Sequence, residues 1–184
     1  MTTYFPEVKR AIRYEGPSSA NALAFKHYQP KARIGGKTMA QHLKFAVCYW
    51  HTFKGTGADP FGGGVYQRPW NEGAGAMDIA RRTMDANFEF IRKLGVDYWC
   101  FHDRDIAPEG ATIRETNRNL ETIVAQAKAL QKATGIKLLW GTANLFSHPR
   151  YSHGAATNPD PRVFALTWAT AWASSPPIFY VAHA

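Results

Sequence analysis

Acidic side chains are scarce in this chain of 184 residues: 14 Asp and Glu stand against 22 Lys and Arg, a formal net charge of +8. The basic residues are scattered, and the sequence has neither a run of five or more of them nor an interleaved aromatic and basic signature. The positive charge therefore indicates a solvated basic surface, and we expect no nucleic-acid partner.

Cysteine is also scarce. The two cysteines, Cys48 and Cys100, each lie within an apolar strand-like run and form no Cys-x-x-Cys or Cys/His cluster. This pattern excludes a disulfide scaffold and favours buried free thiols in a reducing compartment over a metal site.

Long apolar segments are absent as well. The longest charge-free stretch, residues 163–184, is interrupted by Ser174-Ser175-Pro176-Pro177, whereas a spanning helix needs roughly 20 apolar residues. The first nine residues lack the basic segment and apolar core of a signal peptide. We expect a soluble, cytoplasmic protein that has no membrane partner.

What is present indicates a folded α/β domain. With 45% hydrophobic residues the chain can bury a core, yet it is shorter than the roughly 250 residues of a complete eight-fold (β/α) barrel. Three apolar runs, over residues 44–50, 96–101 and 136–140, are typical of strands buried on both faces. Residues 1–42 are polar and irregular, which predicts an N-terminal arm with short helices.

Two amphipathic patterns separate the strands. Apolar positions at steps of three and four predict a helix over residues 77–94, with Gly95 as its C-cap. The second helix begins at Thr112, which forms a capping-box pattern with Glu115, and ends at Gly135.

A last helix is predicted from near Asp160, which completes the order β-α-β-α-β-α. Helices of about 18–20 residues between short strands imply parallel pairing through right-handed crossovers. A doubly wound sheet and part of a barrel both fit this order.

Polar residues gather where the predicted strands end, the edge at which parallel α/β folds build active sites. His102 ends the second strand region, and Asp103 and Asp105 follow it. A His–Asp pair would fix the imidazole tautomer for general acid–base chemistry. Ordinary solvated loop residues are the alternative interpretation.

Aromatic residues form a second candidate group at these strand ends. Trp50, Trp140 and Phe146 would line an apolar pocket wall that stacks on a sugar face, or they belong to the core. Thr142 and Asn144 offer hydrogen bonds to hydroxyl groups, although turn formation would also account for them.

Several longer strings, taken together, resemble xylose isomerase, in particular its longer-chained branch, over roughly residues 4–165. The matching strings are Tyr4–Val8, Phe45–Phe53, Gly57–Gly63, Tyr98–Gly110, Gly141–Tyr151 and Ala155–Pro161. Their number and order make this resemblance far more specific than any single motif.

The resemblance implies an intramolecular oxidoreductase on a TIM barrel. Such an aldose–ketose isomerase acts on D-xylose and related aldoses by ring opening and a hydride shift, and two divalent cations (Mg, Mn or Co) polarise the substrate oxygens. The family forms homotetramers, in which the residue matched by Phe61 reaches into a neighbouring subunit's site.

The resemblance also implies roles for five further residues. His102 and Asp105 match the family's ring-opening pair. Trp50 and Phe146 match the walls of the sugar pocket, and Thr142 matches a contact to substrate hydroxyls.

The chain differs from the family because it has no segments that match the family's later strands. The family's metal ligands, all Glu, Asp or His, and the lysine near the migrating hydride lie on later strands, and no segment here matches them. We therefore expect a partial TIM barrel over residues 43–165 (roughly three βα units), no metal ligands, and a truncated chain that is inactive alone and of doubtful oligomeric state. A non-catalytic basic α/β binding module and a non-functional truncated product are the alternatives.

Residues 166–184 form an atypical tail without Asp, Glu, Lys or Arg. The family instead continues with a charged helix and a strand that ends in Trp-Gly-Gly-Arg-Glu. A shifted reading frame would explain the change, so sequencing the coding DNA past residue 165 should show the family pattern in another frame. The hypothesis fails if no frame restores it.

Overall fold

The computed structural model describes residues 3–72 and 75–174. Its centre is a sheet of three strands in the order β3 (Ala46–Cys48), β4 (Tyr98–His102) and β5 (Lys137–Thr142). Both pairings are parallel, as the alternation of strands and helices predicted. The fold is therefore α/β with a small, open parallel sheet.

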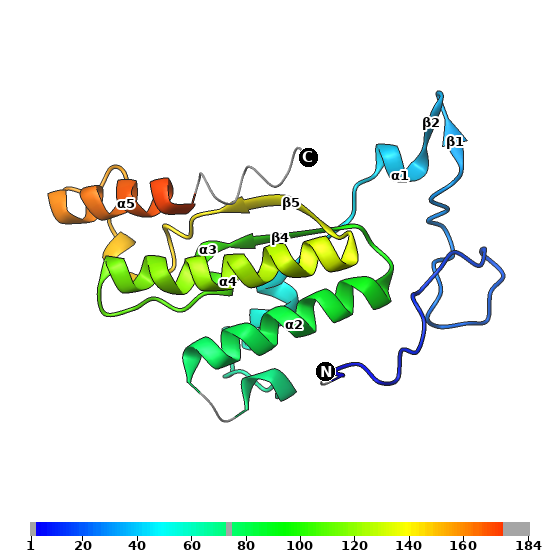
Figure 1. Ribbon diagram of the computed structural model, residues 1–184, viewed down its shortest axis with the longest axis horizontal. Helices are drawn as coiled ribbons and strands as arrows, with labels where there is room; N and C mark the ends of the chain where they lie inside the picture. Colours follow the sequence, from blue (N-terminus) through cyan, green and yellow to red (C-terminus); the bar gives the residue numbers. More distant parts are fainter. Residues whose placement is uncertain (1–2, 73–74, 175–184) are drawn as a thin grey trace.

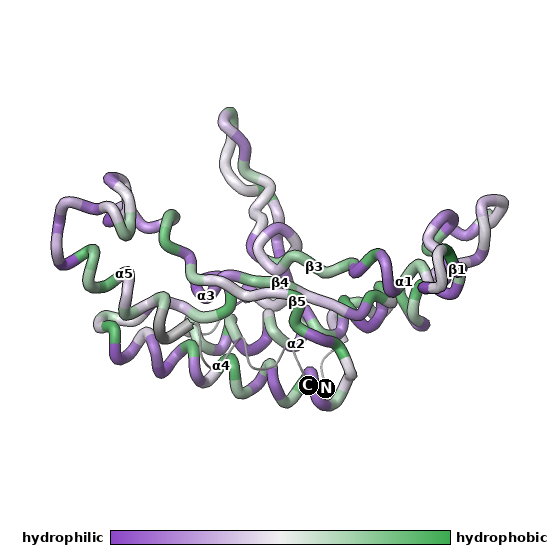
Figure 2. Tube along the Cα trace, turned by 90° about the horizontal axis from the view of Figure 1, so that it is seen from above, coloured by the Kyte–Doolittle hydropathy of each residue, from purple (hydrophilic) through white to green (hydrophobic). Residues whose placement is uncertain are grey.

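Two long helices, α2 (Ala76–Leu94) and α4 (Ile113–Thr134), connect the three strands. Figures 1 and 2 show them side by side along the same face of the sheet. Right-handed crossovers that proceed in one direction along a parallel sheet place their helices on the same face, in a barrel wall and in half of a doubly wound sheet alike. The described strands do not close into a barrel.

The core lies between the sheet and these helices, because the apolar positions spaced by three and four residues fall on one side of each helix. The buried core residues include Ala80, Met84, Phe88 and Ile91 of α2, Leu120, Ile123, Val124 and Ala127 of α4, and Val47, Tyr49, Trp99, Phe101 and Leu138 of the sheet region. Ile113, at the start of α4, is 38% exposed despite fitting the apolar pattern.

The first strand is shorter than predicted. β3 ends at Cys48, and the chain turns at Tyr49 into η1 (Trp50–Lys54), a short π-helix. The apolar run through Trp50 concealed this turn, because a buried helical turn and a buried strand share the same hydrophobic signal.

The segment after β4 is helical, not the solvated loop that was the alternative interpretation of these residues. α3 (Asp103–Ile106) begins directly after His102 and forms a single helical turn. The turn forms because the Asp105 carboxylate accepts the backbone N–H of His102 at 2.9 Å, a local capping bond.

The predicted capping box of α4 is only half correct. The Thr112 hydroxyl accepts the Glu115 N–H at 3.2 Å, as expected of an N-cap. The Glu115 carboxylate, however, accepts the N–H of Ala111 at 2.8 Å, one residue before the cap.

The N-terminal arm contains a small antiparallel hairpin, β1 (Arg33–Ile34) with β2 (Lys37–Thr38), followed by one short helix, α1 (Met39–His42). The backbone N–H groups of Tyr4 and Phe5 donate to the Glu89 carboxylate of α2, which anchors the start of the arm.

Three further elements complete the described chain: η2 (Pro69–Asn71), η3 (Pro149–Tyr151) and α5 (Pro161–Ser174). The predicted helix near Asp160 is thus present. The atypical tail lies in α5 as far as residue 174, and residues 175–184 lie outside the described part. Within the described ranges, no helix is both long and apolar enough to cross a bilayer.

Alanine substitutions at two glycines would test the close contact between the N-terminal arm and the end of α2. Gly95 and Gly135 end α2 and α4 with the same φ of 76°. A Cβ at Gly135 would meet nothing within 4 Å, so we expect Gly135→Ala to lower the free energy of unfolding by about 1 kcal/mol through backbone strain alone.

Gly95→Ala should lower the free energy of unfolding by about 1–3 kcal/mol more than Gly135→Ala does. The reason is that the new Cβ would lie 2.5 Å from the Ile12 carbonyl oxygen of the arm. Urea unfolding of both variants measures the difference. Equal losses would contradict this close contact between arm and helix.

Candidate active site

The carboxyl edge of the sheet brings together four rings that are distant in the sequence. Trp50 follows β3, His102 ends β4, Trp140 lies in β5, and Phe146 follows β5. Ring centroids lie 4.4 Å apart for Trp50 and His102, 5.3 Å for Trp50 and Trp140, and 5.3 Å for His102 and Phe146. We call these four residues the ring cluster.

His102, one of the four residues of the ring cluster, is paired with Asp105. Its Nδ1 lies 2.8 Å from Asp105 Oδ2, which also accepts the His102 backbone N–H. An ionised carboxylate only accepts hydrogen bonds, so Nδ1 of His102 is the donor in this bond. The two side chains are 13% and 12% exposed, which shelters the pair from bulk water without sealing it.

The remaining predicted site residues differ in their exposure and in whether they lie near the ring cluster. Thr142 is the register partner of His102 and is exposed beside it. Trp50 is half-buried, whereas Phe146 is 65% exposed. Phe61 is not brought to the ring cluster; it is 97% exposed in a turn where its N–H donates to Asp59 Oδ1 at 2.8 Å.

Asp103 is the residue whose importance the sequence did not reveal. Its side chain is completely buried, and Oδ1 accepts the backbone N–H groups of Arg104 and Asn144, each at 2.7 Å. The Arg104 guanidinium lies 3.1 Å from its other oxygen. Asp103 thereby ties the segment after β5 to the end of β4.

Asn144 extends this link toward the ring cluster. Its side-chain oxygen accepts the N–H groups of Phe146 and Ser147 at 3.3 and 3.0 Å. The backbone that carries Phe146 is therefore held, through Asn144, by Asp103. The turn-forming interpretation of Asn144 is confirmed by these bonds.

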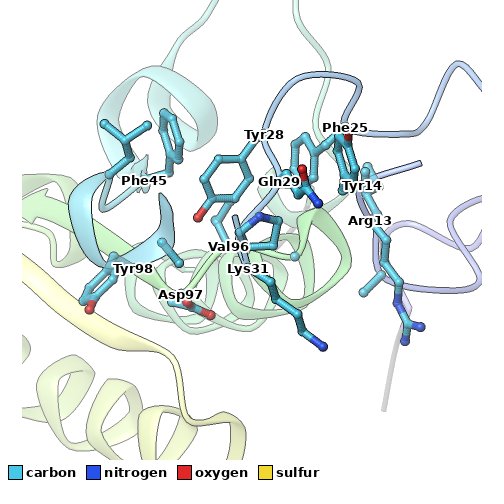
Figure 3. A pocket seen from close by; sticks show the side chains of 16 residues that line it. Arg13, Tyr14, Phe25, Tyr28, Gln29, Lys31, Phe45, Val96, Asp97 and Tyr98 are labelled. Atoms are coloured by element: carbon cyan, nitrogen blue, oxygen red, sulfur yellow. The ribbon is translucent and has the colours of Figure 1, made fainter. Parts of the chain in front are cut away.

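A cavity of about 610 Å³ lies at the opposite, amino edge of the sheet, between the arm and the segment that leads into β4. Figure 3 shows Tyr28, Phe45 and Tyr98 around it, with Asp97 nearby. Burial raises the pKa of the Tyr28 hydroxyl, and the charge of Asp97 adds to the rise. This cavity has no residue in common with the ring cluster.

Among residues 3–72 and 75–174, no group of three or more His, Cys, Asp or Glu is arranged to hold a metal ion. The described residues thus do not fit the two-cation centre that the resemblance implied.

Sequence comparison relates the chain to one enzyme. The xylose isomerase of Caldanaerobacter subterraneus subsp. yonseiensis is 58% identical over 162 residues, which are 88% of this chain and 37% of that protein. The xylose isomerases of Arabidopsis thaliana and Thermoanaerobacterium saccharolyticum are both 54% identical, over 88% and 91% of this chain. This chain resembles the N-terminal portion of a xylose isomerase.

The resemblance to xylose isomerase predicted from the motifs is therefore confirmed, and its extent is defined. The chain spans only 34–38% of the length of these relatives. No protein-family model matches it. Trp50, Phe146 and the His102–Asp105 pair lie within the strings that resemble xylose isomerase, and Trp140 directly precedes one of them.

The role of Asp103 can be measured by removing its charge. We expect Asp103→Asn to lower the free energy of unfolding by about 2–3 kcal/mol, because the buried bonds to Asn144 and Arg104 would lose their carboxylate acceptor. Asp78→Asn is the matched control, since the Asp78–Arg81 pair is 59% and 48% exposed, and it should change stability by less than about 0.5 kcal/mol. Urea unfolding that shows equal effects would contradict the structural role of Asp103.

Proposed function

We propose that the chain supplies the ring-opening pair and one wall of the sugar site of an aldose–ketose isomerase that converts D-xylose to D-xylulose. The observation that carries the proposal is the His102–Asp105 hydrogen bond at the carboxyl edge of the sheet, where the centroid of the His102 ring lies 4.4 Å from that of Trp50. The names of the similar proteins support the choice of substrate.

His102 and Asp105 would act in ring opening as follows. Nε2 of His102 takes the proton of the anomeric O1 hydroxyl while the bond between C1 and O5 breaks. The imidazolium then passes this proton to O5, so no proton is lost overall. Asp105 keeps the imidazole in the required tautomer and stabilises the imidazolium that forms in between.

The rings around His102 would bind the sugar and exclude water. Trp50 and Phe146 contact the His102 ring with centroid distances of 4.4 and 5.3 Å, and a pyranose ring would pack against their exposed parts. Thr142, exposed beside His102, would donate to or accept from a substrate hydroxyl.

The other parts of the proposal concern the complete enzyme. The open sheet would form a wall of a TIM barrel over residues 43–165, with the arm at 1–42 and the tail at 166–184. Two divalent cations (Mg, Mn or Co) would be held by groups outside the described residues, so we assign no step of the hydride shift here.

Assembly is part of the same proposal. Phe61 is displayed on a turn closed by the Asp59–Gly62 bridge and is 97% exposed, which suits insertion into a second copy of the enzyme in a homotetramer. A cytoplasmic location also belongs to the proposal.

The isolated chain should not turn over its substrate. We expect the purified chain with D-xylose and either Mg²⁺ or Mn²⁺ to form no D-xylulose, because no described residues hold the cations. Metal-dependent formation of D-xylulose by this chain would contradict the expectation.

Complementation tests the roles of the residues. Co-expression with the remaining portion of the Thermoanaerobacterium saccharolyticum enzyme should restore isomerisation, because the relative supplies the unmatched 62% of its length (100 − 38). In the complex, His102→Asn should lower kcat by about 100-fold or more through loss of acid–base catalysis.

His27→Asn is the matched control, since His27 is exposed in the arm, and it should leave the rate of the complex unchanged within about twofold. Full activity of His102→Asn would show that the pair is structural. A complex without activity, together with polyanion binding that weakens steeply with salt, would instead support the basic binding module.

A further inference from the structure

Two thiols that are distant in the sequence meet on the sheet. Cys48 of β3 and Cys100 of β4 are register partners, so their side chains leave the same face. The alternate residues Val47, Trp99 and Phe101 belong to the core with α2 and α4. The thiols therefore lie on the opposite face, which neither of those helices covers.

The two thiols are neighbours across the β3–β4 pairing, and both residues are free cysteines. The Cys100 thiol donates to the carbonyl oxygen of Val47, the residue before Cys48, with an S···O distance of 3.8 Å. Cys48 and Cys100 also interact with each other through their side chains. Cys48 is half-buried, which leaves a path from solvent.

Burial governs the chemistry of the pair. It raises the pKa of Cys48, and it raises the pKa of Cys100 to about 11, to which the neighbouring Cys48 adds. Protonated thiols are poor nucleophiles, so disulfide exchange is disfavoured at neutral pH. A metal ion that prefers sulfur can nevertheless displace both protons, because a coordinating thiol is deprotonated outright.

We propose that Cys48 and Cys100 form a two-coordinate site for a soft monovalent cation of the Cu⁺ class. Two thiols and one cation give a bis-thiolate complex and two protons, which balances both atoms and charge. Thiolates select such an ion over Mg²⁺ and Mn²⁺, which prefer oxygen ligands.

The number of ligands supports this class of ion. The described residues add no third His, Cys, Asp or Glu to the pair, so the four ligands of a structural zinc site are not present there. The site is separate from the proposed isomerase chemistry, in which neither thiol takes part.

The pair lies directly below the ring cluster. Cys100 precedes His102 by two residues of β4, a spacing of about 6–7 Å along an extended strand. Cys48 precedes Trp50 by two residues across the turn at Tyr49. A heavy ion held between the thiols is therefore close enough to quench the fluorescence of Trp50.

The experiment is a titration of the full chain with Ag⁺, an air-stable soft monovalent cation. Isothermal titration calorimetry should give an endpoint of one Ag⁺ per chain, with two protons released per ion and quenching of tryptophan fluorescence. An endpoint of two Ag⁺ per chain, one for each independent thiol, would overturn the proposal without recourse to any variant.

Variants then test the chelate. Cys48→Ala and Cys100→Ala should each bind Ag⁺ about 100-fold more weakly and release one proton, because the effective concentration of the second thiol is lost. The double variant, which lacks both thiols, measures any Ag⁺ that the seven histidines bind. Circular dichroism checks folding, and Cys100→Ser serves as a second variant at the buried position. Single variants that bind as tightly as the natural chain would also overturn the proposal.

Anaerobic competition for Cu⁺ with bicinchoninate should give the same ratio of one ion per chain. A different ratio would contradict the proposal.

Discussion

The hydrogen-bonded register of β4 against its two neighbours is the constraint on which the rest of the structure depends. It sets Cys100 beside Cys48 on one side and His102 beside Thr142 on the other. A shift of one residue in either pairing would turn every side chain of the displaced strand to the opposite face. The aromatic side chain of Trp99 would then leave the core, and His102 would enter it.

Two different kinds of interaction hold that register. On the helix side it is apolar packing, in which Trp99 contacts Phe88 of α2 with ring centroids 5.4 Å apart. At the carboxyl edge it is the buried Asp103 carboxylate, which binds backbone N–H groups following both β4 and β5. A buried carboxylate is tolerated only when its oxygens are well bonded, so Asp103 favours one arrangement of these two segments.

Local signals predicted the helices well and the strand ends poorly. The glycines that end α2 and α4 and the apolar spacing within them depend on the nearest few residues, so the printed sequence contains them. The turn at Tyr49 and the single turn of α3 depend on competition between strand pairing and local capping bonds, such as the one that the His102 N–H donates to the Asp105 carboxylate. Composition does not decide such competition, because both outcomes bury the same apolar side chains.

For the candidate site, the sequence by itself determined the residue types at each strand end and the resemblance to xylose isomerase. It also determined the helices that make the pairing parallel. Only the tertiary structure decided that the Trp50, His102 and Phe146 rings touch, that Asp103 is a buried link, and that Cys48 meets Cys100. The physical reason is that these contacts join strands separated by whole helices, and their register is set by backbone hydrogen bonds that no local pattern encodes.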